Sequence, residues 1–380
     1  MQFCGRMYLE KIILTQFKNY ASQSLTLSKR LNCFVGLNGV GKTNLLDAIY
    51  YLCLCKSHFL ASDLDVVLRG SDFTRLEGHF MKNKVREKIV AKVQPRKKKT
   101  IERNDVAYAA LSEHIGFLPV VMFAPDDTLL AKEGSEERRR FIDNVLSQID
   151  NQYLTNLIFY NKILEQRNAL LKKSGFEGKN GHNTEGVDLD LLKIYDAQML
   201  APAAFIFEKR REFTAHFSPI FNEIYRKIAD AKEQVLVTYN SQLLTDNLQN
   251  LLVKNREKDF ILHRTTTGIH KDDWTFEIDE KPLKRFGSQG QLKSFVLALK
   301  LAQYEILRGI KNETPILLLD DIFDKLDANR VENLLQLIVN QSFGQIFITD
   351  THLERMQEMT EKLGVEFKIF TVENAEVKEV

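Results

Sequence analysis

The stretch that decides the fold is Cys33-Phe34-Val35-Gly36-Leu37-Asn38-Gly39-Val40-Gly41-Lys42-Thr43-Asn44-Leu45-Leu46. Residues 36 to 43 fit the phosphate-binding pattern G-x-x-x-x-G-K-[ST], the P-loop. The run before it, Leu31 to Val35, is apolar and suits a buried strand, and Leu45 to Cys55 is long enough for a helix. The pattern therefore lies between a strand and a helix, which is the context that its chemistry requires.

A P-loop holds phosphate mainly with its backbone. Glycines let the N–H groups turn inward around phosphate oxygens, and the N-terminus of the following helix adds a partial positive charge. Lys42 is expected to reach the β- and γ-phosphates and to act in catalysis, and the Thr43 hydroxyl to ligate Mg²⁺. The residues expected to contact the nucleotide here are Gly36, Leu37, Asn38, Gly39, Val40, Gly41, Lys42, Thr43 and Asn44.

A second motif is the apolar run from Pro315 to Leu319, which ends in Asp320 and Asp321. A buried strand that delivers an acid at its carboxyl end is typical of a Walker B motif. We expect Asp320 to hold Mg²⁺, directly or through water, and Asp321 to orient or deprotonate the attacking water. The alternative is a strand followed by an ordinary polar turn.

A third motif is Phe286-Gly287-Ser288-Gln289-Gly290-Gln291, and the apolar pattern from Leu292 to Leu307 after it predicts a helix. Ser288 is a favourable N-cap for that helix. Ser288, Gly290 and Gln291 could instead face the γ-phosphate of a nucleotide. A plain capped helix is the alternative interpretation.

Composition and charge limit the function classes. The chain has 380 residues, so a large domain plus a second one is expected. With 44% hydrophobic and 27% charged residues it has the composition of a soluble globular protein, and a formal net charge of +2 gives no global argument for a nucleic-acid partner. The four cysteines lack zinc-ligand spacing, no signal peptide is recognised and no apolar run is long enough to cross a bilayer. A cytoplasmic location is expected.

The middle of the chain changes to a helical pattern. From Glu136 it is helical for several turns, and apolar residues from Ile142 to Leu164 form one face. A loop is expected over 172–188 and a second helix over 189–228, with Pro202 and Pro219 as kinks or breaks. We predict an inserted arm of two antiparallel helices over 129–254, between the N-terminal (1–128) and C-terminal (255–380) parts of an α/β head with a mixed sheet.

The remaining strands are short. Strand patterns occur before the P-loop over 8–20, in a pair over 76–80 and 85–93, at 120–124, and later at 260–262, 274–278 and 345–349. The paired strands lead to a basic run that suggests a hairpin tip able to contact a phosphate backbone, Arg96, Lys97, Lys98 and Lys99. A solvated turn is the alternative.

Three polar residues next to strands have two interpretations each. His270 and Lys271 lie in a turn before the strand at 274–278, where a structural role is set against contact with nucleotide or DNA. His352 follows the last core strand and either senses a γ-phosphate or is a capping or surface histidine.

The combination of motifs resembles the heads of ATP-binding-cassette (ABC) proteins, and in particular the RecF family. The Asn-Gly form of the P-loop, the Ser288 signature stretch and the turn from Asp324 to Asp327, which resembles a D-loop, carry the first likeness. Family-like stretches then occur in order along nearly the whole chain, including Lys56-Ser57-His58, Phe123-Ala124-Pro125-Asp126 and Arg138-Arg139-Arg140-Phe141-Ile142-Asp143. Departures occur at Phe59, Ile269, Lys271, Asp324 and Lys325, and any family role of Phe59, Lys271 or Lys325 is not carried over.

The resemblance implies a weak, DNA-stimulated ATPase that uses ATP and Mg²⁺ and forms a homodimer on ATP. It further implies binding to double-stranded and gapped DNA, and action with RecR and RecO to load RecA in recombinational repair. Each ATP site would combine Lys42 of one chain with Ser288 of the other. The alternative is another ABC-type ATPase, such as a transporter subunit or a chromosome-associated head; the long insert between Lys42 and Ser288 argues against the former, and chain length against a long coiled coil.

Overall fold

The computed structural model describes residues 7–173, 188–229, 233–322 and 343–380. The chain divides into two compact units. Unit 1 takes residues up to 128, 223–232 and from 288 onward, and unit 2 takes 129–222 and 233–287. The loop expected within 172–188 falls mostly outside the described residues, as do the D-loop at 324–327 and the turn and helix expected after it. The predicted boundaries of the inserted arm, at 128/129 and 254/255, stay a prediction.

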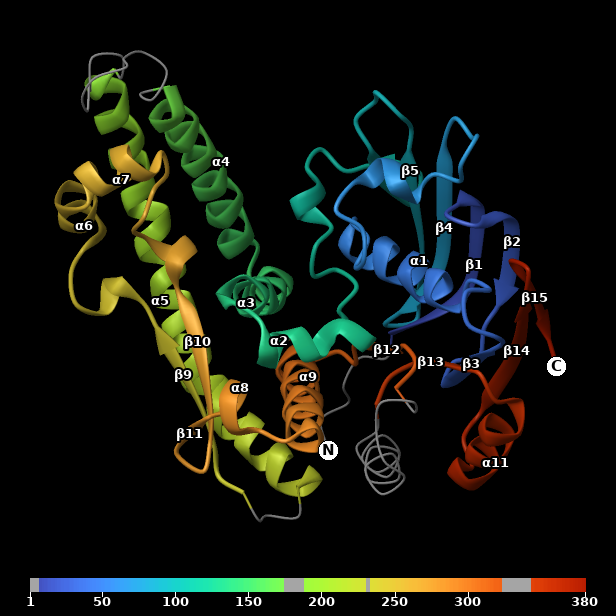
Figure 1. The fold of residues 1–380 in the computed structure, drawn as a ribbon. Helices are drawn as coiled ribbons and strands as arrows, with labels where there is room; N and C mark the ends of the chain where they lie inside the picture. Colours follow the sequence, from blue (N-terminus) through green and yellow to red (C-terminus); the bar gives the residue numbers. More distant parts are fainter. Residues whose placement is uncertain (1–6, 174–187, 230–232, 323–342) are drawn as a thin grey trace. The chain divides into compact units, whose positions relative to one another are not determined.

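Unit 1 contains two six-stranded sheets. One runs in the order β2-β1-β4-β5-β6-β7 and is antiparallel. Its strands are β1 (Met7–Phe17), β2 (Tyr20–Thr26), β4 (Thr74–Lys82), β5 (Val85–Val93), β6 (Thr100–Arg103) and β7 (Val106–Ala107). Alternate side chains of β1 and β4 are buried, and the P-loop helix α1 (Lys42–Leu54) lies against this sheet (Figure 1).

The second sheet of unit 1 runs in the order β15-β14-β3-β13-β12-β8. Five strands are parallel and β15 pairs antiparallel with β14, which confirms the predicted mixed sheet. The strands are β3 (Leu31–Val35), β8 (Val120–Phe123), β12 (Ile316–Leu319), β13 (Ile346–Asp350), β14 (Phe367–Glu373) and β15 (Glu376–Glu379). The strands β3, β8, β12 and β13 are buried along their whole length, as expected for parallel strands covered on both faces.

Helices of unit 1 cover these sheets. α9 (Gln289–Lys311) contacts β8, and α11 (Leu353–Leu363) contacts β14 and β3. One continuous cluster of buried side chains joins both sheets to α1, including Leu14, Phe34, Leu46 and Phe347. The carboxyl ends of β3 and β12, which carry the first two motifs, are thereby fixed by one core.

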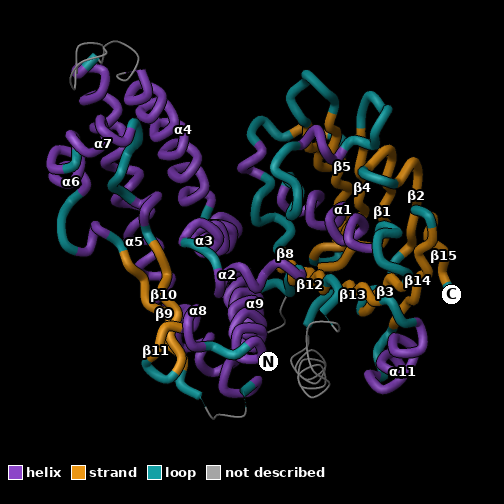
Figure 2. Tube along the Cα trace, in the orientation of Figure 1, coloured by secondary structure: helices purple, strands orange, loops and turns teal. Residues whose placement is uncertain are grey.

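Unit 2 is mainly helical (Figure 2). Its helices are α2 (Leu129–Lys132), α3 (Ser135–Ile149), α4 (Asn151–Lys173), most of α5 (Leu189–Ile228), α6 (Leu248–Lys254), α7 (Arg256–Leu262) and α8 (Leu283–Phe286). A three-stranded sheet is formed by β9 (Val235–Asn240), β10 (Asp273–Ile278) and β11 (Lys281–Pro282). Trp274 is 1% exposed, stacks on Phe213 and donates from Nε1 to the Thr214 hydroxyl at 2.8 Å.

The long helices α4 and α5 are antiparallel, as predicted. Arg167 near the end of α4 pairs with Asp196 near the start of α5 at 2.7 Å, and Lys209 farther along α5 reaches Asp150, just before α4, at 2.9 Å. The two helices therefore form a helical hairpin, and an ion pair joins them near each end of α4.

Three details of the predicted helices and strands were wrong. The run 260–262 was expected to be a strand but lies in α7; Ile261 is 57% exposed, so this short apolar run is not a core segment. A break at Pro202 or Pro219 was wrong, because α5 continues through both prolines and much of that helix is fixed by packing; a kink at either stays a prediction. The helical run from residue 136 is divided at Asp150, whose carboxylate accepts from the amides of Gln152 (2.9 Å) and Tyr153 (3.2 Å) and caps α4.

Candidate nucleotide-binding site

The P-loop has the backbone that its glycines permit. Gly39 (φ 83°) and Gly41 (φ 117°) both adopt positive φ, which side chains other than hydrogen rarely allow. A Cβ at Gly41 would also lie 2.5 Å from the Asn19 amide nitrogen and 2.8 Å from the Tyr20 hydroxyl. Both constraints require glycine at position 41, where α1 begins.

Side chains of residues 19 and 20 donate hydrogen bonds to carbonyl groups of the P-loop. The Asn19 amide donates to the Val40 carbonyl at 3.2 Å, the Tyr20 hydroxyl donates to the Gly41 carbonyl at 3.0 Å, and the Asn44 amide donates to Asn19 at 2.7 Å. By contrast, no group in the described part of the chain accepts a hydrogen bond from the backbone amides of residues 37 to 43. The loop therefore presents a row of free N–H donors at a helix N-terminus, an arrangement suited to an anion.

Lys42 lies across the same loop. Its side chain is largely enclosed, the residue being 4% exposed, and its ammonium donates to the carbonyls of Gly36 (2.7 Å) and Leu37 (3.0 Å). A longer contact of 3.5 Å joins it to the Asn38 side chain. The ammonium is thus held at the loop by neutral carbonyls, without a carboxylate within 4 Å among the described residues.

The Walker B acids meet the P-loop at the carboxyl edge of the parallel sheet. The Thr43 hydroxyl donates to the Asp320 carboxylate at 2.9 Å. Thr349, at the end of the adjacent β13, donates to the same carboxylate at 2.8 Å and accepts from the Asp321 amide at 2.8 Å. Two strands and one helix N-terminus therefore converge on Asp320, with Asp321 next to it at positive φ (45°).

The electrostatics of Asp320 are unusual for an acid. It is 3% exposed, and no cation lies within 4 Å of it among the residues described. Burial raises the pKa of this carboxyl from 3.8 to about 6, against the lowering effect of the Thr349 and Thr43 hydroxyls. A cluster of oxygen ligands around a buried carboxylate, with no cation in contact with it among the described residues, is a candidate cation site.

Ser288 occupies the predicted N-cap of α9. Its hydroxyl accepts from the Gln291 amide at 3.2 Å, and the Gln291 side chain accepts from the Ser288 amide at 2.7 Å. These two bonds complete a capping box. The cap interpretation of Ser288 is confirmed; the nucleotide contacts of Ser288, Gly290 and Gln291 stay predictions.

His352 is the N-cap residue of α11, but its side chain does not cap. The ring Nδ1 lies 2.8 Å from the Thr351 hydroxyl and 3.0 Å from the Arg355 guanidinium, and the backbone amide donates to Asp350 at 2.8 Å. The side chain is 59% exposed at the edge that carries Asp320 and Asp321. Its role toward a γ-phosphate stays a prediction.

The basic run lies where it was predicted, in the turn between β5 and β6. Arg96, Lys97 and Lys98 are exposed. Lys99 differs, because its ammonium pairs with Asp63 at 2.7 Å and donates to the Cys55 carbonyl at 2.6 Å. Lys99 therefore ties the hairpin to the segment after α1.

Sequence reasoning missed three residues of the nucleotide edge. Thr349 was assigned only to the strand at 345–349, and Asn19 and Tyr20 to the end of the segment over 8–20. The signal for Thr349 was its polar side chain at the end of an otherwise apolar strand, next to a strand that ends in two acids. Nothing local in the sequence indicates that Asn19 and Tyr20 support the P-loop from 21 residues away.

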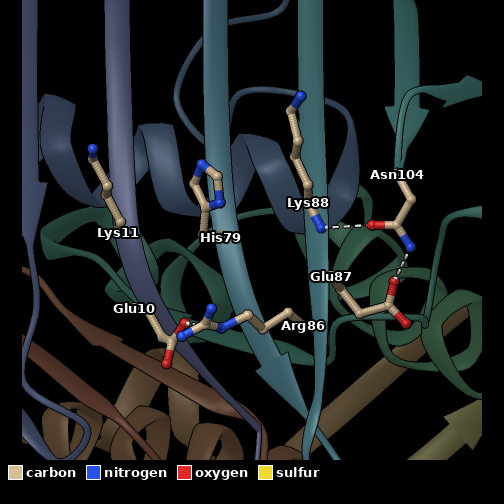
Figure 3. Close-up of a pocket in the computed structure, with 7 residues that line it drawn as sticks. All are labelled: Glu10, Lys11, His79, Arg86, Glu87, Lys88 and Asn104. Atoms are coloured by element: carbon tan, nitrogen blue, oxygen red, sulfur yellow. Dashed lines mark hydrogen bonds and ion pairs between the residues drawn. The ribbon is translucent and has the colours of Figure 1, made fainter.

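A separate pocket opens on the antiparallel sheet (Figure 3). Two contacts join residues of its lining: Arg86 pairs with Glu10 at 3.6 Å, and Asn104 donates to Glu87 at 2.7 Å. The Lys88 amide donates to Asn104 at 2.9 Å. The pocket includes none of the residues predicted to bind nucleotide or DNA.

Comparison with known proteins gives the family. The family model described as RecF/RecN/SMC N terminal domain matches residues 8–375. The chain is 44% identical over 366 residues to the DNA replication and repair protein RecF of Flavobacterium johnsoniae, covering 96% of this chain and 100% of the relative. It belongs to the RecF family.

A second RecF-family relative, from Phocaeicola vulgatus, is 41% identical and covers 98% of both chains. Among solved structures, the recombination mediator protein RecF-ATP in the RecFOR pathway superimposes with a TM-score of 0.86 at 30% identity, covering 99% of this chain and 98% of that one. An Smc head domain from Pyrococcus furiosus superimposes with a TM-score of 0.56 at 19% identity, which shows a shared head fold. The predicted ATPase-head fold with a long helical insertion is confirmed.

Proposed function

We propose that this RecF-family protein is an ATP-dependent DNA-binding protein of recombinational repair. It binds ATP and Mg²⁺, forms a homodimer on ATP, hydrolyses ATP slowly and binds double-stranded or gapped DNA. There it acts with RecO and RecR to load RecA. The observation that carries the proposal is the row of free amides at residues 37 to 43 beside the Thr43–Asp320 contact. The close structural match to RecF-ATP supports ATP as the nucleotide.

The residues present fit a magnesium nucleotide. Thr43, Asp320 and Thr349 bring two hydroxyls and a carboxylate together, which are the hard oxygen donors that Mg²⁺ prefers. No cluster of three or more His, Cys, Asp or Glu side chains suited to a metal occurs within the described ranges, so the phosphates would complete the coordination. Mg²⁺ would supply charge neutralisation for the phosphates and for Asp320.

Each residue of this chain has a separate role in the reaction. The loop amides and Lys42 orient the phosphates and neutralise them, since Lys42 is already held at the loop. Thr43 and Asp320 would hold the metal. Asp321, fixed by the bond from its amide to Thr349, orients the attacking water and accepts its proton. We further propose that His352, exposed at the same sheet edge, senses the γ-phosphate.

The second half of each site comes from the partner chain. Ser288 and Gly290 begin α9, a helix of 23 residues whose N-terminus favours an anion. In a head-to-tail dimer this helix end faces the γ-phosphate held by the Lys42 of the other subunit. Two composite ATP sites result, and dimerisation becomes dependent on ATP.

The DNA contact predicted from the sequence is the hairpin run Arg96 to Lys99. We propose Arg96, Lys97 and Lys98 as the phosphate contacts, because Lys99 pairs with Asp63. We include gapped DNA, RecR, RecO and RecA in the proposal as partners that the family resemblance implies. Within the described parts of the chain, no helix combines the length and apolarity needed to span a membrane. A cytoplasmic location is part of the proposal.

The composite site is tested by mixing two inactive variants, Lys42→Met and Ser288→Arg. In a mixed dimer one site inherits both lesions and the other none. Random pairing makes half of the dimers mixed with one intact site each, so a 1:1 mixture should recover about a quarter of wild-type DNA-dependent ATPase activity. Ser62→Arg is the matched control, because Ser62 also caps a helix in unit 1, accepting from Leu64 at 3.1 Å; that variant should keep activity.

No recovery in a mixture shown to contain mixed dimers would contradict independent composite sites. Titrating wild type with Ser288→Arg then distinguishes the remaining cases. A site complete within one chain predicts a linear loss of activity, and sites that must fire together predict loss with the square of the wild-type fraction. Indifference of the wild-type ATPase to duplex DNA would contradict the DNA-binding part of the proposal.

A further inference from the structure

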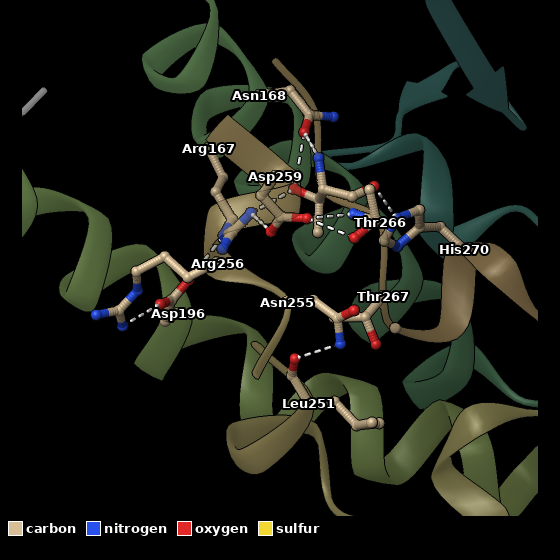
Figure 4. Close-up of polar contacts among 12 residues, drawn as sticks. Arg167, Asn168, Asp196, Leu251, Asn255, Arg256, Asp259, Thr266, Thr267 and His270 are labelled. Atoms are coloured by element: carbon tan, nitrogen blue, oxygen red, sulfur yellow. Dashed lines mark hydrogen bonds and ion pairs between the residues drawn. The ribbon is translucent and has the colours of Figure 1, made fainter. Parts of the chain in front are cut away.

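A loop of unit 2, residues 264–272, is held unusually firmly (Figure 4). The Asn168 side chain accepts from both the amide and the hydroxyl of Thr265 at 2.7 Å, and Asp259 accepts from the amide (2.8 Å) and hydroxyl (2.6 Å) of Thr266. His270 contacts the Tyr160 hydroxyl at 2.8 Å and the Thr265 carbonyl at 3.1 Å. The loop therefore presents its side chains from a fixed backbone.

The acids around this loop are all committed to other arginines. Asp259 pairs with the fully buried Arg167 at 2.7 Å, and Asp272 pairs with Arg210 at 2.9 Å. Two other nearby acids also form ion pairs: Asp143 with Arg210 at 2.8 Å, and Asp273 with Arg138 at 2.7 Å.

Three cations at the loop are left without an acid. Within the described ranges, no carboxylate lies within 4 Å of Arg139, Arg264 or Lys271. Arg264 and Lys271 are exposed, and Arg139 donates only to the Asp272 carbonyl, at 2.6 Å. Although the residue is exposed, partial desolvation by the surrounding protein lowers the pKa of Lys271, and the neighbouring charges of Arg264 and Arg139 lower it further. Two bonds bring these residues together: Arg139 donates to the carbonyl of Asp272, next to Lys271, and His270 contacts the carbonyl of Thr265, next to Arg264. Lys271 is therefore within electrostatic reach of both arginines.

We propose that Arg139, Arg264 and Lys271 form a phosphate-binding site that contacts the backbone of duplex DNA. An anion placed there offsets the repulsion of Lys271 by the two arginines, and two planar guanidinium groups match the oxygens of a phosphate. A preorganised loop loses little conformational entropy on binding. The proposal rests on the DNA binding proposed above and adds to it a contact in unit 2, on residues far apart in the sequence.

The test removes two charges without touching the structural bonds. Arg264→Gln with Lys271→Gln leaves Arg139 and its bond to Asp272 intact. Affinity for a duplex oligonucleotide is measured with ATP over a series of salt concentrations. Two lost phosphate contacts should flatten the slope of log K against log salt by about 1.8, at about 0.9 per contact. ATP affinity and the unfolding temperature should not change.

Two controls isolate the site. Arg140→Gln with Lys193→Gln removes the same charge from the same unit, but both residues pair with acids of their own helices, and the slope should not change. Arg264→Lys with Lys271→Arg keeps both charges and moves one guanidinium group from position 264 to position 271. The slope of log K against log salt should stay close to that of wild type.

The outcomes separate this inference from the proposed function. A wild-type protein that binds no duplex DNA with ATP overturns both. A wild type that binds DNA, with the neutralised variant unchanged in slope and affinity, overturns only the phosphate site. An equal loss of affinity for poly-L-glutamate would also overturn it, since the cluster would then serve an acidic protein partner instead.

Discussion

Two regions bury charged groups in different ways: the nucleotide edge of unit 1 and the arginine network of unit 2. Asp320 is 3% exposed, and in the part of the chain that the structure describes its carboxylate accepts hydrogen bonds only from hydroxyl groups. Arg210 is 1% exposed and contacts two carboxylates, at 2.8 and 2.9 Å, and the Ile269 carbonyl at 2.7 Å. In the first region, a charged carboxylate and several backbone amides lack partners of opposite charge or acceptors within the described protein. In the second region, the charged groups pair with one another and most of their hydrogen-bonding atoms have partners.

The difference separates binding from architecture. A buried carboxylate without a cation is costly, and a row of free amides stabilises nothing in the protein itself, so both are explained by a ligand that is part of the working state. Arg210 joins Asp143 after the start of α3 to Asp272 at the end of the 264–272 loop. Its contacts determine how helices and loop fit together in unit 2.

The largest expected effect breaks the network of unit 2. Arg210→Met leaves Asp272, itself 1% exposed, and Asp143 without a cation, and removing one member of a buried pair costs about 3–5 kcal/mol. The free energy of unfolding from urea titration measures the loss. Arg211→Met is the control, because Arg211 is exposed and pairs with Glu208 in its own helix, so its substitution should cost less than about 1 kcal/mol.

Equal effects of Arg210→Met and Arg211→Met would mean that the buried pairs do not stabilise unit 2. The difference between the two regions would then lie in packing around Trp274 instead of in charge. Retention of ATP binding by Arg210→Met at low temperature would show that the nucleotide edge is complete within unit 1.

The same contrast explains what could be predicted from the sequence. Lys42, Thr43 and the two Walker B acids lie in two short segments whose local pattern carries the chemistry, and the Ser288 cap is complete within four residues. Arg210 and Asp272 are 62 residues apart and Arg167 and Thr265 are 98 apart, so no window of sequence contains both partners. Lys271 looked like a lone turn residue for this reason. The strand predicted at 260–262 failed because three apolar residues do not distinguish a strand from the end of a helix.

The next effect concerns Asp320 without nucleotide. Its pKa in the folded protein, about 6, is above the ordinary value of 3.8, so the protonated form is favoured by folding. Stability from this group is fully present below pH 3.8 and is lost as the pH rises through 6. Asp320→Asn should therefore be more stable than wild type at pH 7.5 by about 2–3 kcal/mol, at about 1.4 kcal/mol per pKa unit, and the gap should close as the pH falls toward 4.

Urea titrations of both proteins from pH 4 to pH 8 measure this gap. Asp126→Asn, at an exposed acid after β8, controls for a change of net charge and should leave the pH profile as in wild type. Saturating ATP and Mg²⁺ should reverse the order at pH 7.5, because only the wild type holds the metal. An Asp320→Asn protein that is less stable than wild type at pH 7.5 without nucleotide would show that the carboxylate is compensated after all.

The smallest effect on stability, and the sharpest on the proposed DNA surface, concerns the hairpin of unit 1. Replacing Arg96, Lys97 and Lys98 with Gln removes exposed charges and should change the free energy of unfolding by less than about 0.5 kcal/mol. If all three contact phosphates, the slope of log K against log salt for duplex DNA should flatten by about 2.7, at about 0.9 per contact. ATP affinity should not change.

Lys99→Gln is the matched control with the opposite expectation. It loses the Asp63 pair, so the free energy of unfolding should fall by about 0.2–1 kcal/mol, while the slope of log K against log salt should change by no more than one contact is worth. If the triple variant kept the wild-type slope and DNA affinity while Arg264→Gln with Lys271→Gln lost both, DNA binding would be assigned to the 264–272 loop of unit 2. The hairpin run would then be a solvated turn.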